Sequence, residues 1–163
     1  MPTLPLAGIR VVDMTVVWAG PGTTTLLGDL GAEIIRVEDI HHFPNSTRGL
    51  APRMTREQAA GAGFIGSMFP DRDPGEHPFN RHAVFNSHGR NKKGVTMNLA
   101  DPRGRRAFLD LIAMSDVFVE NNSLRVIRSL DIDYDVLSRV NPRLVMLRMP
   151  PLGLDGPFSE FLG

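Results

Sequence analysis

The sequence predicts an α/β fold in which helices cover both faces of a doubly wound, mostly parallel sheet. Two observations predict it. Short apolar runs rich in β-branched residues alternate along the chain with segments of helical periodicity. The first strand, helix and second strand also follow one another so closely that the two strands pair in parallel through a right-handed crossover. The length of 163 residues suits one domain.

The first unit of this fold is a strand, a glycine turn and a helix. Residues 9–15 are an apolar run that predicts a buried strand, and residues 20–22 then begin a helix with Pro21 near its first position. Gly31 ends that helix, and residues 33–38 predict the second strand.

Three further strands follow a long stretch without periodicity. Residues 39–85 mix Pro, Gly, Arg, Met and His, which is typical of a functional loop or lid, or of a disordered segment. Regular patterns then return and predict strands at 94–99, 117–121 and 144–149, with intervening helices that begin at the capping residues Asp101 and Asp133.

The composition excludes several classes of function. The 18 basic and 18 acidic residues give a net charge of zero, so we expect no broad nucleic-acid surface and only a local basic site. The absence of cysteine excludes disulfides, thiolate nucleophiles and cysteine-based zinc sites, and it favours the cytoplasm. No apolar stretch is long enough to predict a membrane span.

Two candidate ligand segments follow strands, because parallel sheets bind ligands at the carboxyl ends of their strands. Residues 17–22 precede a helix N-terminus, which favours a phosphate or carboxylate; the glycines and Pro21 could equally only shape a tight turn. Trp18 could be a core residue or a stacking surface for an adenine. Residues 120–122 could contact the ligand or cap the following helix.

The third candidate is a basic segment at residues 88–94, just ahead of a predicted strand. It holds three cations within four residues, which suits the phosphates of a nucleotide-like ligand. A solvated loop is the alternative explanation.

Other kinds of site fit less well. A dinucleotide site would need a third glycine where Thr25 stands, although Glu38 and Asp39 could bind a ribose. His41 and His42 are neighbours and point in different directions, so we expect no metal site.

Seven short motifs occur in order and together resemble one known family. They are LAGIRVVDMT at 6–15, AGP at 19–21, LGAEIIRVE at 30–38, RNKK at 90–93, DPRG at 101–104, DVFVEN at 116–121 and NPRLV at 141–145. The chain resembles the N-terminal part of the class III CoA-transferases, which include formyl-CoA transferase, carnitine CoA-transferase and the α-methylacyl-CoA racemases. Two residues depart from the family. Trp18 stands where formyl-CoA transferase has glutamine, and Asp39 stands where many members have arginine.

The resemblance implies a Rossmann-like domain over residues 1–163 that binds coenzyme A or an acyl-CoA thioester, with no metal. It implies a small carboxylic acid as second partner, and a homodimer of interlocked full-length chains or self-association of this part alone. It also implies a set of residues along the CoA, namely Trp18, Ala19, Gly20, Arg90, Asn91, Lys92, Lys93, Met97 and Asn121.

The resemblance assigns no catalytic residue to this chain. The transferases form covalent intermediates on an aspartate that follows the segment resembling residues 152–157, and the racemases use a histidine after the position matching Gly163. We therefore expect the chain alone to be inactive. The alternatives are a racemase-like isomerase fragment and a non-catalytic CoA-binding module.

Overall fold

The computed structural model describes residues 3–39, 41, 48, 51 and 53–159. Its five strands are β1 Arg10–Met14, β2 Glu33–Glu38, β3 Lys92–Thr96, β4 Val117–Glu120 and β5 Val145–Arg148. They form one sheet in the order β3-β2-β1-β4-β5, and every pairing is parallel. The predicted α/β class and doubly wound sheet are confirmed.

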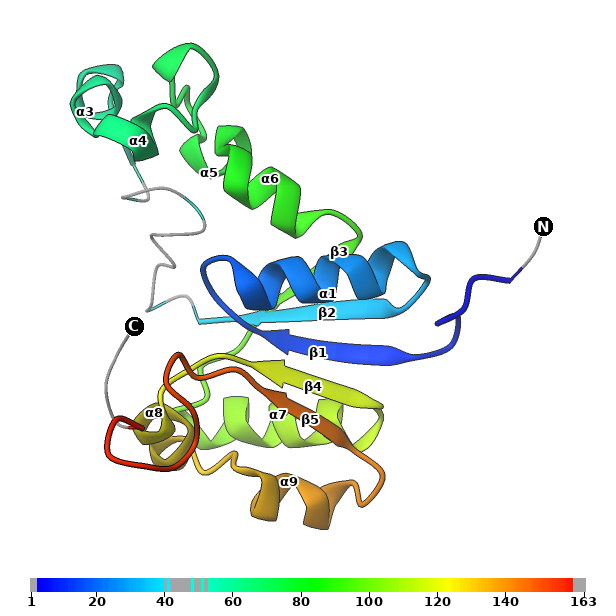
Figure 1. The fold of residues 1–163 in the computed structure, drawn as a ribbon. Coiled ribbons are helices and arrows are strands. Elements are labelled where there is room, and N and C mark those ends of the chain that lie inside the picture. Colours follow the sequence, from blue (N-terminus) through cyan, green and yellow to red (C-terminus); the bar gives the residue numbers. More distant parts are fainter. Residues whose placement is uncertain (1–2, 40, 42–47, 49–50, 52, 160–163) are drawn as a thin grey trace.

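Helices cover both faces of this sheet (Figure 1). One face carries α1 (Ala19–Asp29) and α6 (Ala83–Gly89), and the other carries α7 (Pro102–Ala113), α8 (Leu124–Ser129) and α9 (Tyr134–Val140). Alternation along the strands divides the core between the faces, because neighbouring side chains of a strand point in opposite directions. Val11 packs on the α1 side, whereas Val12 packs with Phe108 and Phe118 on the other.

Side-chain caps fix where three of these helices begin. Asp101, Ser123 and Asp133 each accept a hydrogen bond from a backbone N–H in the first turn of α7, α8 and α9. Hydrogen bonds from the side chain and backbone of Arg103 lower the pKa of Asp101 to about 2. The predicted caps Asp101 and Asp133 therefore occupy the expected positions.

The sequence did not predict the short helices between β2 and β3. In the stretch 39–85, which was expected to lack regular structure, the described residues form α3 (Arg56–Gly61), α4 (Gly63–Gly66), a 3-10 turn (Pro70–Arg72) and α5 (Pro78–Arg81), and α6 begins at its end. Each of these elements is too short to show a helical period, and Gly or Pro bounds most of them.

Strand β3 also begins two residues before the predicted position, because Lys92 and Lys93 are strand residues rather than loop residues. Among the helices of the described residues, none has the length and apolar character needed to cross a bilayer.

Candidate functional site

The carboxyl ends of β1 and β4 lie side by side at the centre of the sheet, where the strand order reverses. From β1 the chain turns to α1 on one face, and from β4 it turns to α8 on the other. Such a switch point leaves a crevice in which α/β proteins bind ligands. Two predicted segments, residues 17–22 and 120–122, therefore come together here.

Asn121 joins the two sides of this switch point. Its side-chain Nδ2 donates to the carbonyl oxygen of Val16 at 2.8 Å, and its Oδ1 accepts from the N–H of Val16 at 2.9 Å. The side chain of Asn122 adds a bond to the carbonyl oxygen of Met14 at 3.1 Å. The amide of Asn121 thus fixes the β1–α1 turn, in addition to any contact with a ligand.

The turn itself presents an aromatic side chain and a strained residue. Trp18 is 53% exposed and contacts the ring of His88 edge-on, with 5.5 Å between the ring centroids. Val17 has a φ angle of 69°, which is unusual for a β-branched residue. Ala19 begins α1, so the free N–H groups of its first turn are next to Trp18.

Gly20 is required by close packing rather than by a phosphate loop. A Cβ atom at this position would lie 2.4 Å from the Cβ of Thr15. Thr25, where a dinucleotide site needs a third glycine, is buried, and its hydroxyl contacts the carbonyl oxygens of Pro21 and His88. The Thr25 hydroxyl joins α1 to α6. The turn therefore lacks the third glycine of a dinucleotide site, and Gly20 serves the packing of α1 against Thr15.

The basic segment is ion-paired within the fold. Arg90 pairs with Asp29 at 2.6 Å, and Asn91 bonds the same carboxylate at 2.8 Å. Lys93 pairs with Glu33 at 2.6 Å and is 73% exposed. Arg90 and Lys93 therefore remain at the surface, where a ligand anion can compete for weak exposed pairs.

Lys92 differs from its neighbours because its side chain is only 2% exposed. Its ammonium donates to Asp13 Oδ2 at 2.9 Å, to the carbonyl oxygen of Pro21 at 2.8 Å and to Thr24 Oγ1 at 2.7 Å. Burial lowers the pKa of Lys92, and the Asp13 carboxylate opposes that shift. The ammonium lies beneath the turn and faces the protein interior.

A second cationic group lies at the end of β2 and was missed in the sequence. Arg36 and Arg48 both contact Glu38, whose pKa stays below its usual value because these arginines outweigh the effect of burial. Arg48 stacks on Phe85, with its Cζ 3.9 Å from the ring centroid. Within the described residues, Nη1 of Arg36 is buried without a hydrogen-bond partner. These cations contact Glu38, the residue before Asp39.

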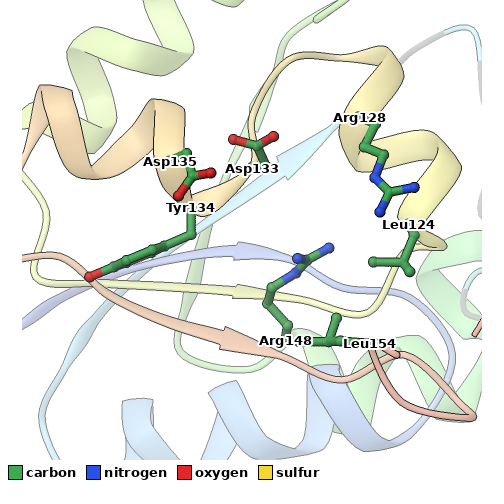
Figure 2. Close-up of a pocket in the computed structure, with 7 residues that line it drawn as sticks. All are labelled: Leu124, Arg128, Asp133, Tyr134, Asp135, Arg148 and Leu154. Atoms are coloured by element: carbon green, nitrogen blue, oxygen red, sulfur yellow. The ribbon is translucent and has the colours of Figure 1, made fainter. Parts of the chain in front are cut away.

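A further cavity of about 330 Å³ opens where β4 and β5 end (Figure 2). Arg128 from α8 and Arg148 from β5 direct their guanidinium groups toward it, and Leu124 and Leu154 form an apolar wall. Arg148 also pairs with the fully buried Glu120 at 2.9 Å. The sequence offered only a weak signal here, since these arginines are 20 residues apart and belong to no motif.

The remaining predicted positions are dispersed. Met97 lies at the end of β3, where its N–H donates to the carbonyl oxygen of Glu38 at 2.9 Å, and its side chain packs against the core. Of the two adjacent histidines, His42 lies outside the described residues. The site is thus an edge of the sheet rather than one pocket, with the β1–α1 turn at its centre.

Comparisons with known proteins identify the same family that the seven sequence motifs resemble. Residues 6–163 match CoA-transferase family III. The chain is 37% identical over 158 residues to the succinyl-CoA–L-malate CoA-transferase beta subunit of Chloroflexus aurantiacus, which covers 97% of this chain and 33% of that protein. It is 32% identical over 159 residues to human succinyl-CoA:glutarate CoA-transferase, which covers 98% of this chain and 31% of that protein.

The fold is also similar to part of a longer solved structure. The crystal structure of a CAIB/BAIF family protein from Brucella suis superposes with a TM-score of 0.77 at 30% identity, covering 99% of this chain and 37% of that chain. The chain spans about a third of the length of the curated relatives it matches. Since the family match extends over residues 6–163, the chain belongs to CoA-transferase family III.

Proposed function

We propose that this chain is the coenzyme A-binding N-terminal part of an enzyme that transfers CoA from an acyl-CoA thioester to a small carboxylic acid. The observation that carries the proposal is the family match over residues 6–163. In the reaction, the thioester bond of the donor breaks and a thioester forms on the acceptor, while one acceptor carboxylate oxygen leaves in the released acid.

CoA would lie along the carboxyl edge of the sheet. Its phosphates need cations, and at this edge we propose Arg128 and Arg148 at the β4–β5 cavity, which Asp133 and Asp135 also line. Of the positions that the resemblance implied, the proposed contacts at this edge are Trp18, Ala19, Gly20, Met97 and Asn121. Arg90, Asn91 and Lys93 lie at the opposite, amino end of the sheet, and the ammonium of Lys92 is buried.

We also propose small dicarboxylates as the acids, in the cytoplasm. The two relatives described above are named for succinyl-CoA with malate or glutarate. A homodimer is part of the proposal, supported by apolar side chains that the edge strand β5 leaves exposed. The alternatives are a racemase-like isomerase and a CoA-binding module without turnover.

An exchange assay separates these alternatives. The complete protein containing this chain is incubated with succinyl-CoA and labelled glutarate or malate, and the label is followed into the CoA ester. The proposal expects a labelled CoA ester and an equal amount of free succinate. Deuterium uptake from D₂O at the α-carbon of a 2-methylacyl-CoA, without label transfer, would show an isomerase instead. CoA binding without either reaction would favour the third alternative, a CoA-binding module without turnover.

A further inference from the structure

The β1–α1 turn holds a conformation that its own residues do not favour. Val17 is β-branched and has a positive φ angle of 69°. Such a residue persists only where the surrounding structure over-determines it, and strained residues of this kind gather at binding sites. The contacts that hold this turn are therefore part of how the site is built.

Asp13 holds the turn from both of its ends. One carboxylate oxygen, Oδ1, accepts from the N–H of Thr15 at 3.0 Å and also from the Thr15 hydroxyl, at the start of the turn. The other, Oδ2, accepts from the hydroxyl of Thr24 at 2.7 Å, beyond the turn on α1. With Lys92 on the same oxygen, the fully buried carboxylate has four donors, which is its full capacity.

Lys92 completes this arrangement from β3, the edge strand that lies two places from β1. An ammonium has three donors, and those of Lys92 contact Asp13, the carbonyl oxygen of Pro21 and the Thr24 hydroxyl. Two of these acceptors belong to α1, so the lysine attaches the start of that helix to β1. With 2% of its side chain exposed, it has no free donor for a ligand.

We propose that Lys92 and Asp13 are positioning residues that hold the strained Thr15–Ala19 turn in its binding conformation, and that the Lys92 ammonium does not contact the phosphates of CoA. The proposal rests on the proposed function, because it takes this turn to line the CoA site. It divides the basic segment into two roles. Arg90 and Lys93 form exposed ion pairs at the end of α1 and the start of β2, whereas Lys92 acts on the turn from beneath.

Hydrogen–deuterium exchange read by mass spectrometry tests the positioning role without any ligand. The variant is Lys92→Met in the 163-residue chain, and the control is Lys93→Met, which removes an exposed ammonium from the next residue of the strand. In Lys92→Met, we expect the amides of residues 15–22 to exchange about tenfold faster or more, while those of β4 keep their protection. The Lys93→Met variant should match the wild type.

Binding of CoA and of pantetheine, which lacks the phosphates, tests the ligand role. If Lys92 positions the turn, Lys92→Met weakens the binding of both by a similar factor. If it contacts a phosphate, only the affinity for CoA falls and the exchange at 15–22 stays unchanged, which overturns the proposal. Because the exchange experiment uses no ligand, a failure of CoA to bind at all would count against the proposed function alone.

A second variant covers the case in which an unpaired buried Asp13 unfolds the chain. The double substitution Asp13→Asn with Lys92→Met removes both charges. The proposal expects it to fold, by far-UV circular dichroism, with fast exchange confined to residues 15–22. Global unfolding of this double variant would overturn the proposal, since the pair would then hold the whole sheet rather than the turn.

Discussion

The side chain of Asn121 forms two hydrogen bonds with the backbone of Val16, across 105 residues of sequence and the switch point of the sheet. An amide suits this task because it offers one donor and one acceptor side by side. The bonds tie the end of β4 to the turn after β1, which are the two segments that line the proposed CoA site.

Replacing this amide by a carboxylate should weaken CoA binding. In Asn121→Asp, the oxygen that replaces Nδ2 faces the carbonyl oxygen of Val16, so one bond is lost and a repulsion takes its place. We expect the Kd for CoA to rise by about tenfold, the effect of one such bond. Calorimetric titration measures it, with Asn86→Asp, which loses a similar exposed bond in α6, as the control. Equal Kd values for the two variants would contradict this role of Asn121.

Gly20 should tolerate no side chain. A Cβ there would lie 2.4 Å from the Cβ of Thr15, so Gly20→Ala must push Thr15 and α1 apart. We expect a loss of about 1–3 kcal/mol in the free energy of unfolding, the range for overpacked sites. Urea denaturation measures it. Gly94→Ala is the control, because no atom lies within 4 Å of its added Cβ; a loss as large in the control would refute the packing argument.

His88 should make the stability of the chain depend on pH. Burial and the neighbouring Lys92 ammonium hold the pKa of His88 below its ordinary value of 6.5. As the pH falls below 6.5, the unfolded chain therefore gains a proton that the folded chain resists, and stability is lost. Well above pH 6.5, His88 is neutral in both states and the free energy of unfolding is not reduced by its protonation.

The measurement is urea denaturation between pH 5 and pH 7.5. His88→Gln should lose less stability than the wild type as the pH falls from about 6.5, the ordinary pKa of histidine. His77→Gln serves as the control, since it changes a histidine outside this site. Parallel pH profiles for the wild type and His88→Gln would show that the pKa of His88 is not lowered by folding.

The edge strand β5 should promote self-association. Val145 is 61% exposed and Leu147 is 40% exposed, and both lie on an edge whose backbone groups can pair with another chain. We expect light scattering after size exclusion to give a mass above that of the monomer for the 163-residue chain. Lysine at both positions should restore the monomer, whereas Leu26→Lys on α1 should not. A monomeric wild type would exclude association through this edge.

The sequence was sufficient to predict the strands and the helices α1, α7 and α9. Apolar β-branched runs identified all five strands, and Asp101 and Asp133 marked the starts of α7 and α9. The helices α3 to α6 were missed because tertiary packing, and not periodicity, stabilises elements of one or two turns. The shift in β3 has a different cause, since two lysines at the start of a strand read as a loop.

The meeting of the candidate segments at one edge of the sheet was predictable, but their side-chain pairings were not. Glycine turns and polar residues after strands indicated the carboxyl edge of the sheet, where the β1–α1 turn and the end of β4 meet. The contact between Lys92 and Asp13 depends on the face that each side chain takes on strands two places apart, 79 residues from each other in sequence. The only sequence signal was Asp13 itself, a charge within an apolar strand that needs a buried partner.

Calorimetric titration of the chain with CoA, and in parallel with NAD, tests the central claim most directly. The account predicts saturable binding of CoA and none of NAD at the same concentrations, because the β1–α1 turn has Thr25 where a dinucleotide site needs glycine. Tighter binding of NAD, or binding of neither ligand, would contradict it.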